Sequence, residues 1–201
     1  MFNARRAKVK RRTKETDILV SLNIDGRGNS KISTGIGFLD HMLELFAKHG
    51  LFDLEIKAKG DLQVDIHHTN EDVAICLGQA FNQAIGKKEG IRRFGDRTVP
   101  MDEALVHVVI DISGRPYLNS NWSTKVHERR DVEGYRLEYA RQFLQAFVNN
   151  FPITMNIAIL SSGPDMHHLI EAIFKATAKA LDDAAQIDPR MKGVPSTKGR
   201  I

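Results

Sequence analysis

The 201-residue sequence lacks the features of secreted, membrane-spanning and disulfide-stabilised proteins. Cys76 is the only cysteine, so no disulfide can form within the chain, and its apolar neighbours predict a buried side chain. The first twelve residues hold no apolar segment like that of a secretory signal. No apolar run approaches the roughly 20 residues that a transmembrane helix needs. We therefore expect a protein of a reducing compartment, the cytoplasm, that does not enter a membrane.

The sequence also lacks a proline- and glycine-rich linker that would separate two domains. Its hydrophobic fraction of 42% and charged fraction of 27% are ordinary for a globular protein. We expect a single domain over residues 1–201, built of two similar halves at about 1–90 and 91–187. Residues 188–201 are polar, contain two prolines and two glycines, and are expected to form an extended tail.

Much of the net charge of +4 lies near the N-terminus, where seven lysines and arginines occur between residues 5 and 14. Such a segment fits a nucleic-acid-binding arm. It also fits an edge strand whose exposed side carries charges that prevent aggregation. A phosphorylated small molecule is a third partner that basic residues suit. We favour the edge strand and expect no nucleic-acid partner.

The order of apolar patterns repeats along the chain. Residues 18–25 and 104–111 are similar strand-like segments rich in branched apolar residues, at a separation of 86 positions. Each is followed by an amphipathic helical pattern, a short strand and a longer helical pattern. This order predicts an α+β fold made by internal duplication, with antiparallel-rich sheets that carry helices on one face. The later elements are expected at about 39–46, 51–58 and 67–86, and again at about 140–147, 153–160 and 167–186.

Two segments of the form HHxxE begin the longer helices, at residues 67–71 and 167–171. On a helix the first histidine and the glutamate share a face, whereas adjacent histidines point about 100° apart. Each segment therefore offers one histidine and one glutamate to one metal ion and its other histidine to a second ion. The two segments meet either within one chain or between neighbouring chains. Imidazole and carboxylate donors without thiolate suit Mn, Fe, Zn or Ni, and the metalloprotease pattern HExxH is absent.

The remaining histidines differ in their expected roles. His41 and His49, about two helical turns apart, can face the same side of the first amphipathic helix. Asp40 either orients His41 as a metal ligand or accompanies a solvated histidine. His107, in a strand, and His127, in a loop, are expected to have no catalytic role.

Eight sequence motifs occur in order over nearly the whole chain: RRTKETDI (11–18), STGIGFLDHML (33–43), HHTNEDVAICLGQA (67–80), RFG (93–95), PMDEAL (100–105), SGRPYL (113–118), HHLIEAIFKA (167–176) and PSTKG (195–199). Together they resemble the imidazoleglycerol-phosphate dehydratase family of histidine biosynthesis. The resemblance implies dehydration of imidazoleglycerol phosphate to imidazole acetol phosphate. It also implies two Mn²⁺ ions per active site, active sites formed between subunits, and a cage of twenty-four copies of the chain.

The motif positions imply which residues form the site. The implied general base is Glu15, in the turn-like sequence TKET. The implied catalytic residues are Glu15, His41, His67, His168 and Glu171. The implied metal ligands are His41, His67, His68, Glu71, His167, His168 and Glu171. The implied substrate-binding residues are Glu15, His49, Arg93, Arg115, Lys175, Ser196, Thr197 and Lys198, whose cationic members suit a phosphate.

One position departs from the family pattern. Gln142 is the counterpart of His41 in the second half, at a separation of 101 residues, and many family members carry histidine there. A carboxamide oxygen is a weaker metal donor than an imidazole nitrogen. The sequence therefore predicts that one of the two ions is bound more weakly.

Two other functions fit part of the sequence. A non-catalytic, metal-linked cage protein requires the histidines but not Glu15, Arg93 or Lys198. A nucleic-acid-binding domain uses the basic N-terminal segment and leaves both HHxxE segments without a role. The dehydratase accounts for all of these residues, so we expect a metal-dependent hydro-lyase.

Overall fold

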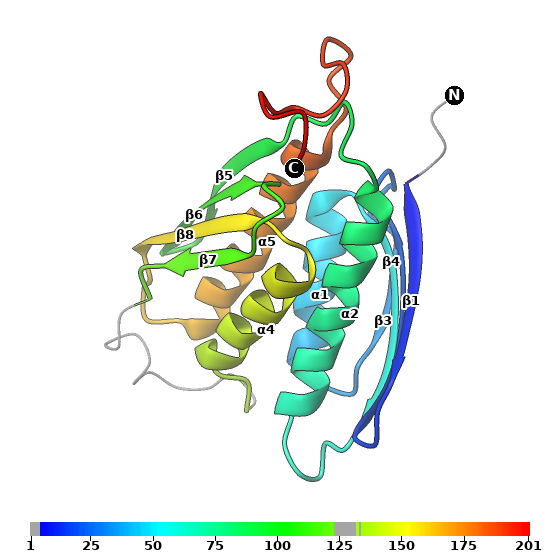
Figure 1. Cartoon of the computed structure of the whole chain (residues 1–201). Coiled ribbons are helices and arrows are strands. Elements are labelled where there is room, and N and C mark those ends of the chain that lie inside the picture. The colour runs from blue at the N-terminus through cyan, green and yellow to red at the C-terminus, as the bar shows by residue number, and fades with distance from the viewer. Residues whose placement is uncertain (1–4, 123–131, 133) are drawn as a thin grey trace.

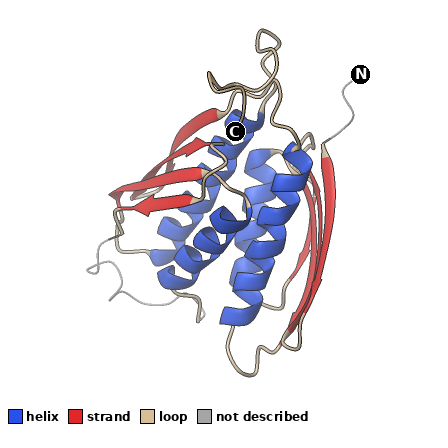
Figure 2. Ribbon diagram, viewed as in Figure 1, coloured by secondary structure: helices blue, strands red, loops and turns tan. Residues whose placement is uncertain are grey.

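The computed structural model describes residues 5–122, 132 and 134–201, and His127 lies outside these residues. Two β-sheets form the outer layers, and the four helices of the described residues lie between them (Figures 1 and 2). Each sheet packs one face against helices. This is the α+β architecture, with helices on one face of each sheet, that the sequence predicts.

The first half of the chain supplies the first sheet, with strands β1 (Arg6–Arg12), β2 (Thr16–Asn23), β3 (Ser30–Ser33) and β4 (Asp53–Gly60). They lie in the order β1-β2-β4-β3, and neighbours are antiparallel except for β3 and β4. Alternate residues of β2, among them Ile18, Val20 and Leu22, are buried, as expected for a strand with one face on the core.

The second half repeats this sheet with strands β5 (Phe94–Met101), β6 (Ala104–Asp111), β7 (Tyr117–Ser120) and β8 (Thr154–Ser161). The order is β5-β6-β8-β7, and only β7 and β8 are parallel. Because β2 begins at Thr16 and β6 at Ala104, equivalent residues are separated by 88 positions here. The separation of 86 inferred from the sequence is therefore wrong by two. Side chains alternate with a period of two, so this error leaves the buried face of the strand unchanged.

The helices of the two halves pack against each other. They are α1 (Gly37–Gly50), α2 (His67–Ile85), α4 (Leu137–Asn150) and α5 (Met166–Ala185). α2 lies on the first sheet and α5 on the second, but α1 packs against α5 and α2 against α4. Each helix of one half thus has a helix of the other half as its neighbour. His107 lies within β6, as expected.

Aromatic side chains join the two halves in the core. The ring centroid of Phe81 lies 5.9 Å from Phe46 and 5.0 Å from Phe52, both in the first half. It also lies 5.5 Å from Phe147 and 5.7 Å from Phe151, both in the second half. Phe81 is 1% exposed, so this contact is fully removed from water. A shared core of this kind holds the two halves in one fixed arrangement.

The basic N-terminal segment forms the edge strand β1, so the favoured interpretation of that segment is confirmed. Part of its charge is neutralised within the chain. Arg11 Nε donates to Asp72 Oδ1 on α2 at 2.8 Å, and Asp72 Oδ2 accepts the Thr16 hydroxyl at 2.5 Å. Cys76, on the same helix as Asp72, is buried as expected.

The tail after α5 contains no helix or strand and lies along residues 90–93. The backbone N–H of Gly90 donates to the carbonyl of Gly193 at 2.8 Å, and the Arg93 side chain donates to the carbonyl of Pro195 at 2.9 Å. The tail is therefore attached to the start of the second half. None of the described helices is long and apolar enough to cross a membrane.

Replacing Phe81 by alanine removes the aromatic contact between the halves. We expect Phe81→Ala to lower the free energy of unfolding by about 3–5 kcal/mol, because it leaves a cavity in a dry core. Urea denaturation of the metal-free protein measures this. Val64→Ala, at a side chain that is 67% exposed, is the control and is expected to change the value by less than about 0.5 kcal/mol. Equal effects of the two substitutions would contradict the central place of Phe81.

Candidate functional site

Both HHxxE segments begin a long helix in the same way. The backbone N–H of His67 donates to Asp65 Oδ1 at 3.2 Å, and that of His167 donates to Asp165 Oδ1 at 2.8 Å. An aspartate in this place satisfies a free N–H of the first helical turn and so fixes where the helix starts. Both histidine pairs therefore lie in a first turn, next to the loop before the helix.

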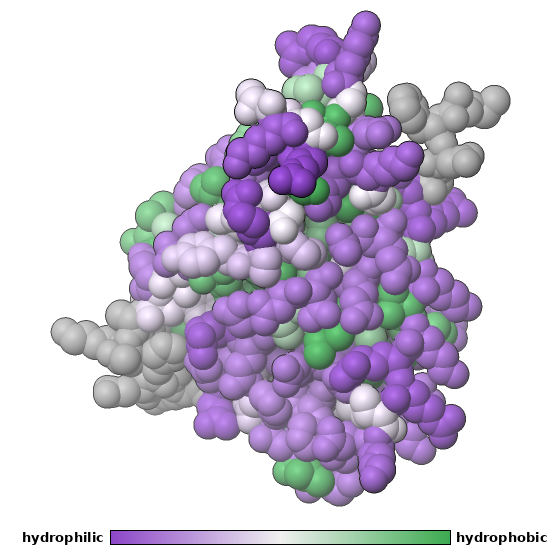
Figure 3. Space-filling view, in the orientation of Figure 1, coloured by the Kyte–Doolittle hydropathy of each residue, from purple (hydrophilic) through white to green (hydrophobic). Residues whose placement is uncertain are grey.

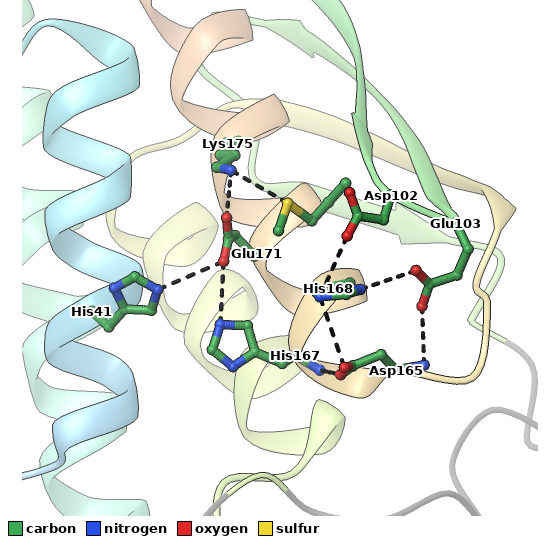
Figure 4. Close-up of polar contacts among 9 residues, drawn as sticks. His41, Asp102, Glu103, Asp165, His167, His168, Glu171 and Lys175 are labelled. Atoms are coloured by element: carbon green, nitrogen blue, oxygen red, sulfur yellow. Dashed lines mark hydrogen bonds and ion pairs between the residues drawn. The ribbon is translucent and has the colours of Figure 1, made fainter.

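One group of potential metal donors, the first donor cluster, joins the two halves. His41 on α1, with His167 and Glu171 on α5, places its ligand atoms within 4.8 Å of one another (Figure 4). Glu171 Oε2 lies 3.2 Å from His167 Nε2 and 3.6 Å from His41 Nε2. Glu171 is only 6% exposed, whereas both imidazoles reach the surface. Two imidazole nitrogens and one carboxylate can together hold a divalent cation.

A second donor cluster has the same plan with one change. His67 Nε2 lies 3.2 Å from Glu71 Oε2 on α2, and His67 Nδ1 lies 3.0 Å from Gln142 Oε1 on α4. Gln142 thus stands in the place of His41. Its Oε1 faces His67 Nδ1, the nitrogen that Glu71 does not contact, and weaker binding of one of the two ions stays a prediction. In this arrangement the carboxamide orients the ring and leaves Nε2 with Glu71.

The second histidine of each pair is held by a carboxylate outside its own helix. His68 Nδ1 lies 3.0 Å from Asp61 Oδ2, and His168 Nδ1 lies 3.0 Å from Glu103 Oε2 (Figure 4). These hydrogen bonds are the largest cause of a raised pKa for both imidazoles. The two histidines of each pair therefore contact different carboxylates, as expected for adjacent residues that point about 100° apart on a helix.

Asp40 does not orient His41. Its Oδ1 accepts the backbone N–H of Thr34 at 2.8 Å and the Thr34 hydroxyl at 2.5 Å, which closes the turn before α1. The ring of His41 instead lies against that of His167, with a centroid distance of 5.5 Å. The contact that aligns His41 therefore comes from the other half of the chain.

Lys175 lies one turn beyond Glu171 on α5 and forms an ion pair with it (Figure 4). Burial raises the pKa of Glu171, but Lys175, followed by His167 and His41, outweighs this and keeps that pKa below its usual value. The pKa of His49 is lowered by burial and then by the charge of Lys175. Lys175, an implied substrate-binding residue whose role stays a prediction, thus lies beside the first donor cluster.

The other implied phosphate-binding residues gather near the C-terminal end of α5, around a cavity of about 670 Å³. The backbone N–H of Arg93 donates to the carbonyl of Ala184, which places this cavity at the end of α5 opposite His167. Arg93 has a positive φ of 75°, and its guanidinium donates to Asp111 at 2.7 and 3.1 Å. The surface around the tail is strongly hydrophilic (Figure 3). The implied residues that line the cavity are Arg93, Arg115, Ser196, Thr197 and Lys198.

Glu15 lies exposed in the turn between β1 and β2. The turn is fixed by the Thr13 hydroxyl, which accepts the backbone N–H groups of Glu15 at 3.1 Å and Thr16 at 2.9 Å. The carboxylate of Glu15 forms no hydrogen bond or ion pair with the rest of the described chain. Its charge is one of the causes of the raised pKa of His68. Glu15 therefore acts electrostatically on His68, a potential metal ligand, without a hydrogen bond to it.

Comparisons with known proteins show the family to which this chain belongs. The model of the imidazoleglycerol-phosphate dehydratase family matches residues 34–181. The imidazoleglycerol-phosphate dehydratase of Thermoanaerobacter pseudethanolicus is 57% identical over 195 residues, which cover 97% of this chain and 98% of that protein. The enzyme of the same name from Acetivibrio thermocellus is 55% identical over 197 residues, or 98% of this chain and 99% of that one.

The chain belongs to the imidazoleglycerol-phosphate dehydratase family.

Solved structures of this family have the same fold. The crystal structure of imidazoleglycerol-phosphate dehydratase from Staphylococcus aureus superposes with a TM-score of 0.81 at 38% identity and covers 91% of this chain and 99% of that chain. The structure from Pyrococcus furiosus, in complex with (S)-C348, also gives 0.81, at 37% identity, and covers 96% and 100%. The duplicated fold of this family member is thus shared by these two enzymes.

Several residues that hold the histidines were not recognised from the sequence. Asp65 and Asp165 lie two residues before each histidine pair, and the repeated pattern DxHH would have identified them. Glu103 lies within the motif PMDEAL but was given no role. Asp61 has no counterpart in the second half, so no repeat marks it.

The Lys175–Glu171 ion pair should contribute to stability only while Glu171 is ionised. Since the folded-state pKa of Glu171 is lowered, the contribution is fully present above about pH 4.5, its ordinary value, and is lost as the pH falls through the folded-state pKa. A double-mutant cycle of Lys175→Met and Glu171→Gln, by urea denaturation of the metal-free protein at pH 7, is expected to give a coupling of about 0.5–3 kcal/mol. A coupling of zero at pH 7, or one that grows in acid, would contradict this.

Proposed function

We propose that this protein dehydrates imidazoleglycerol phosphate to imidazole acetol phosphate, in histidine biosynthesis, with two Mn²⁺ ions in each active site. The observation that carries the proposal is the pair of donor clusters, each built from both halves of a family member. The cationic and hydroxyl side chains around the cavity at the C-terminal end of α5 support an enzyme over a purely structural cage, because a structural cage does not require them. A cytoplasmic location stays a prediction based on the single cysteine.

The donor atoms suit a divalent cation. The first donor cluster offers two imidazoles and one carboxylate that is almost fully buried, and an anion in that position is stabilised by a bound cation. Mn²⁺ accepts this mixture of nitrogen and oxygen donors. When bound, the cations would supply Lewis-acid stabilisation of the negative charge that develops on the substrate.

The active site is proposed to form between subunits, because one chain holds its parts too far apart. Glu171 and Ala184 both lie on α5, thirteen residues apart, which is about 20 Å along a helix. The first donor cluster contains Glu171, and the phosphate-binding cavity begins beside Ala184. A substrate with three carbons between its ring and its phosphate cannot span this distance. If a neighbouring copy places its own cavity next to the donor clusters, the substrate can contact both. The proposed cage of twenty-four copies provides such neighbours.

The chain's own residues then have separate tasks. The reaction removes a hydroxyl from the carbon that carries the ring and a proton from the next carbon, and the resulting enol becomes the ketone. Glu15 is proposed to take the proton, since its carboxylate is free and its turn is fixed. Arg93, Arg115 and Lys198 of another copy are proposed to bind the phosphate. Their contacts hold the reacting carbons against the base.

Removal of metal should abolish activity and weaken the assembly. We expect prolonged dialysis against EDTA to reduce dehydration of imidazoleglycerol phosphate to background, and Mn²⁺ to restore it. Because ligands are proposed to come from neighbouring copies, the mass by light scattering should fall at the same time. Full activity after exhaustive chelation would rule out the metal. Activity lost at constant mass would argue against ligands shared between copies.

Mixed assemblies test whether one site uses two chains. His41→Ala removes a metal ligand, and Lys198→Ala removes a phosphate contact at an exposed position. Each variant alone is expected to be nearly inactive. Co-expressed in one assembly, they should regain part of the wild-type activity, because the donor clusters of one chain can meet the intact cavity of the other. Co-assemblies no more active than the separate variants would show that each chain uses only its own residues.

A further inference from the structure

The turn that carries Glu15 occurs twice in the chain. Thr13 and Thr16 flank the first turn, whose two residues are Lys14 and Glu15. The second turn joins β5 to β6, where Met101 pairs with Ala104. Its two residues are Asp102 and Glu103, so Glu103 is the counterpart of Glu15 at the separation of 88 positions that relates β2 to β6.

The two equivalent glutamates have different surroundings. Glu103 Oε2 lies 3.0 Å from His168 Nδ1, and its Oε1 accepts the backbone N–H of Asp165 at 3.2 Å (Figure 4). Both carboxylate oxygens of Glu103 therefore have a hydrogen-bond partner, and one of these partners is a histidine of the HHxxE segment. Glu15, in the part of the chain that the structure describes, has no such contact with the equivalent histidine His68.

In the first half a different residue contacts that histidine. Asp61 follows β4 directly, and its two carboxylate oxygens lie 3.0 and 3.2 Å from His68 Nδ1. The register of β4 and β8 relates Asp61 to Ser162, so the second half has no carboxylate there. The two halves therefore bring a carboxylate to the same ring nitrogen from different elements of the fold.

A carboxylate on Nδ1 determines what the other nitrogen can do. When Nδ1–H donates to a carboxylate, Nε2 carries the lone pair, and the ring is fixed in orientation and made more basic. We propose that Asp61 and Glu103 are positioning residues that present Nε2 of His68 and His168 to the metal ions. Because Asp61 holds His68, Glu15 is free to act on the substrate, whereas its counterpart Glu103 is not. This inference rests on the proposed metal-dependent function.

Metal titration separates the two roles of the equivalent glutamates. We expect Glu103→Leu and Asp61→Leu to weaken Mn²⁺ binding about 10- to 100-fold, measured from the EPR signal of free Mn²⁺. Glu103→Gln should lose less, because its amide oxygen still accepts Nδ1–H. Glu15→Gln should bind Mn²⁺ like the wild type but lower kcat by about 10²- to 10⁴-fold at saturating metal.

Glu55→Leu is the matched control. Glu55 lies on β4 and pairs with Lys57 at 2.9 Å, away from both histidine segments, so this variant should bind Mn²⁺ like the wild type. Thermal unfolding of the metal-free proteins checks that the fold is intact.

Three results would overturn the inference. The first is an unchanged Mn²⁺ affinity in Glu103→Leu, and the second is an equal affinity in Glu103→Gln and Glu103→Leu. The third is a loss of affinity in Glu15→Gln as large as that in Glu103→Leu. Because these titrations need no substrate, the expected pattern in a protein without dehydratase activity would refute the proposed reaction and keep the positioning roles. Dehydratase activity in a protein that binds no Mn²⁺ would refute the positioning roles and keep the proposed reaction.

Discussion

The packing of α1 against α5 and of α2 against α4 is the constraint on which the candidate site depends. Neither the first nor the second donor cluster is complete within one half of the chain. His41 meets His167 and Glu171, and Gln142 meets His67, only because a helix of one half lies beside a helix of the other. The aromatic contacts of Phe81 with both halves hold these helices at fixed positions. The apolar core thus sets the geometry of the polar site.

The two similar halves contain two similar clusters, and the differences between the clusters are the basis of the separate roles that we propose. At the position of His41 the second half has Gln142, and at the position of Glu15 it has Glu103. If the two clusters were identical, Glu15 and Glu103 would make the same contacts. The added carboxylate of Asp61 breaks this symmetry, because it contacts His68 in place of Glu15. Two equal binding sites can in this way acquire unequal tasks without a change of fold.

The fold and the first residues of the site could be predicted from the sequence because both depend on local patterns. Apolar periodicity gave the strands and helices, and the spacing of HHxxE gave one histidine and one glutamate on a common face. The separation of 86 residues between the strands was wrong by two, and side-chain alternation concealed the error. With the correct separation of 88, Glu103 would have been recognised as the counterpart of Glu15. The i, i+4 spacing also made the ion pair of Lys175 with Glu171 predictable, whereas the contact of Glu171 with His41 depends on which side of α5 faces α1.

The length of α5 offers a physical reason for the proposed assembly of several copies of the chain. The helix separates a cluster of acidic and imidazole groups near its start from a cluster of cationic groups near its end. Within one chain this separation keeps Arg93 and Lys198 away from the carboxylates that are proposed to bind cations, although Lys175 pairs with Glu171. Between two chains the same separation becomes useful, because the cationic end of one copy can meet the metal-binding end of another. In the proposed assembly, a phosphorylated substrate at such a junction would contact both ends at once.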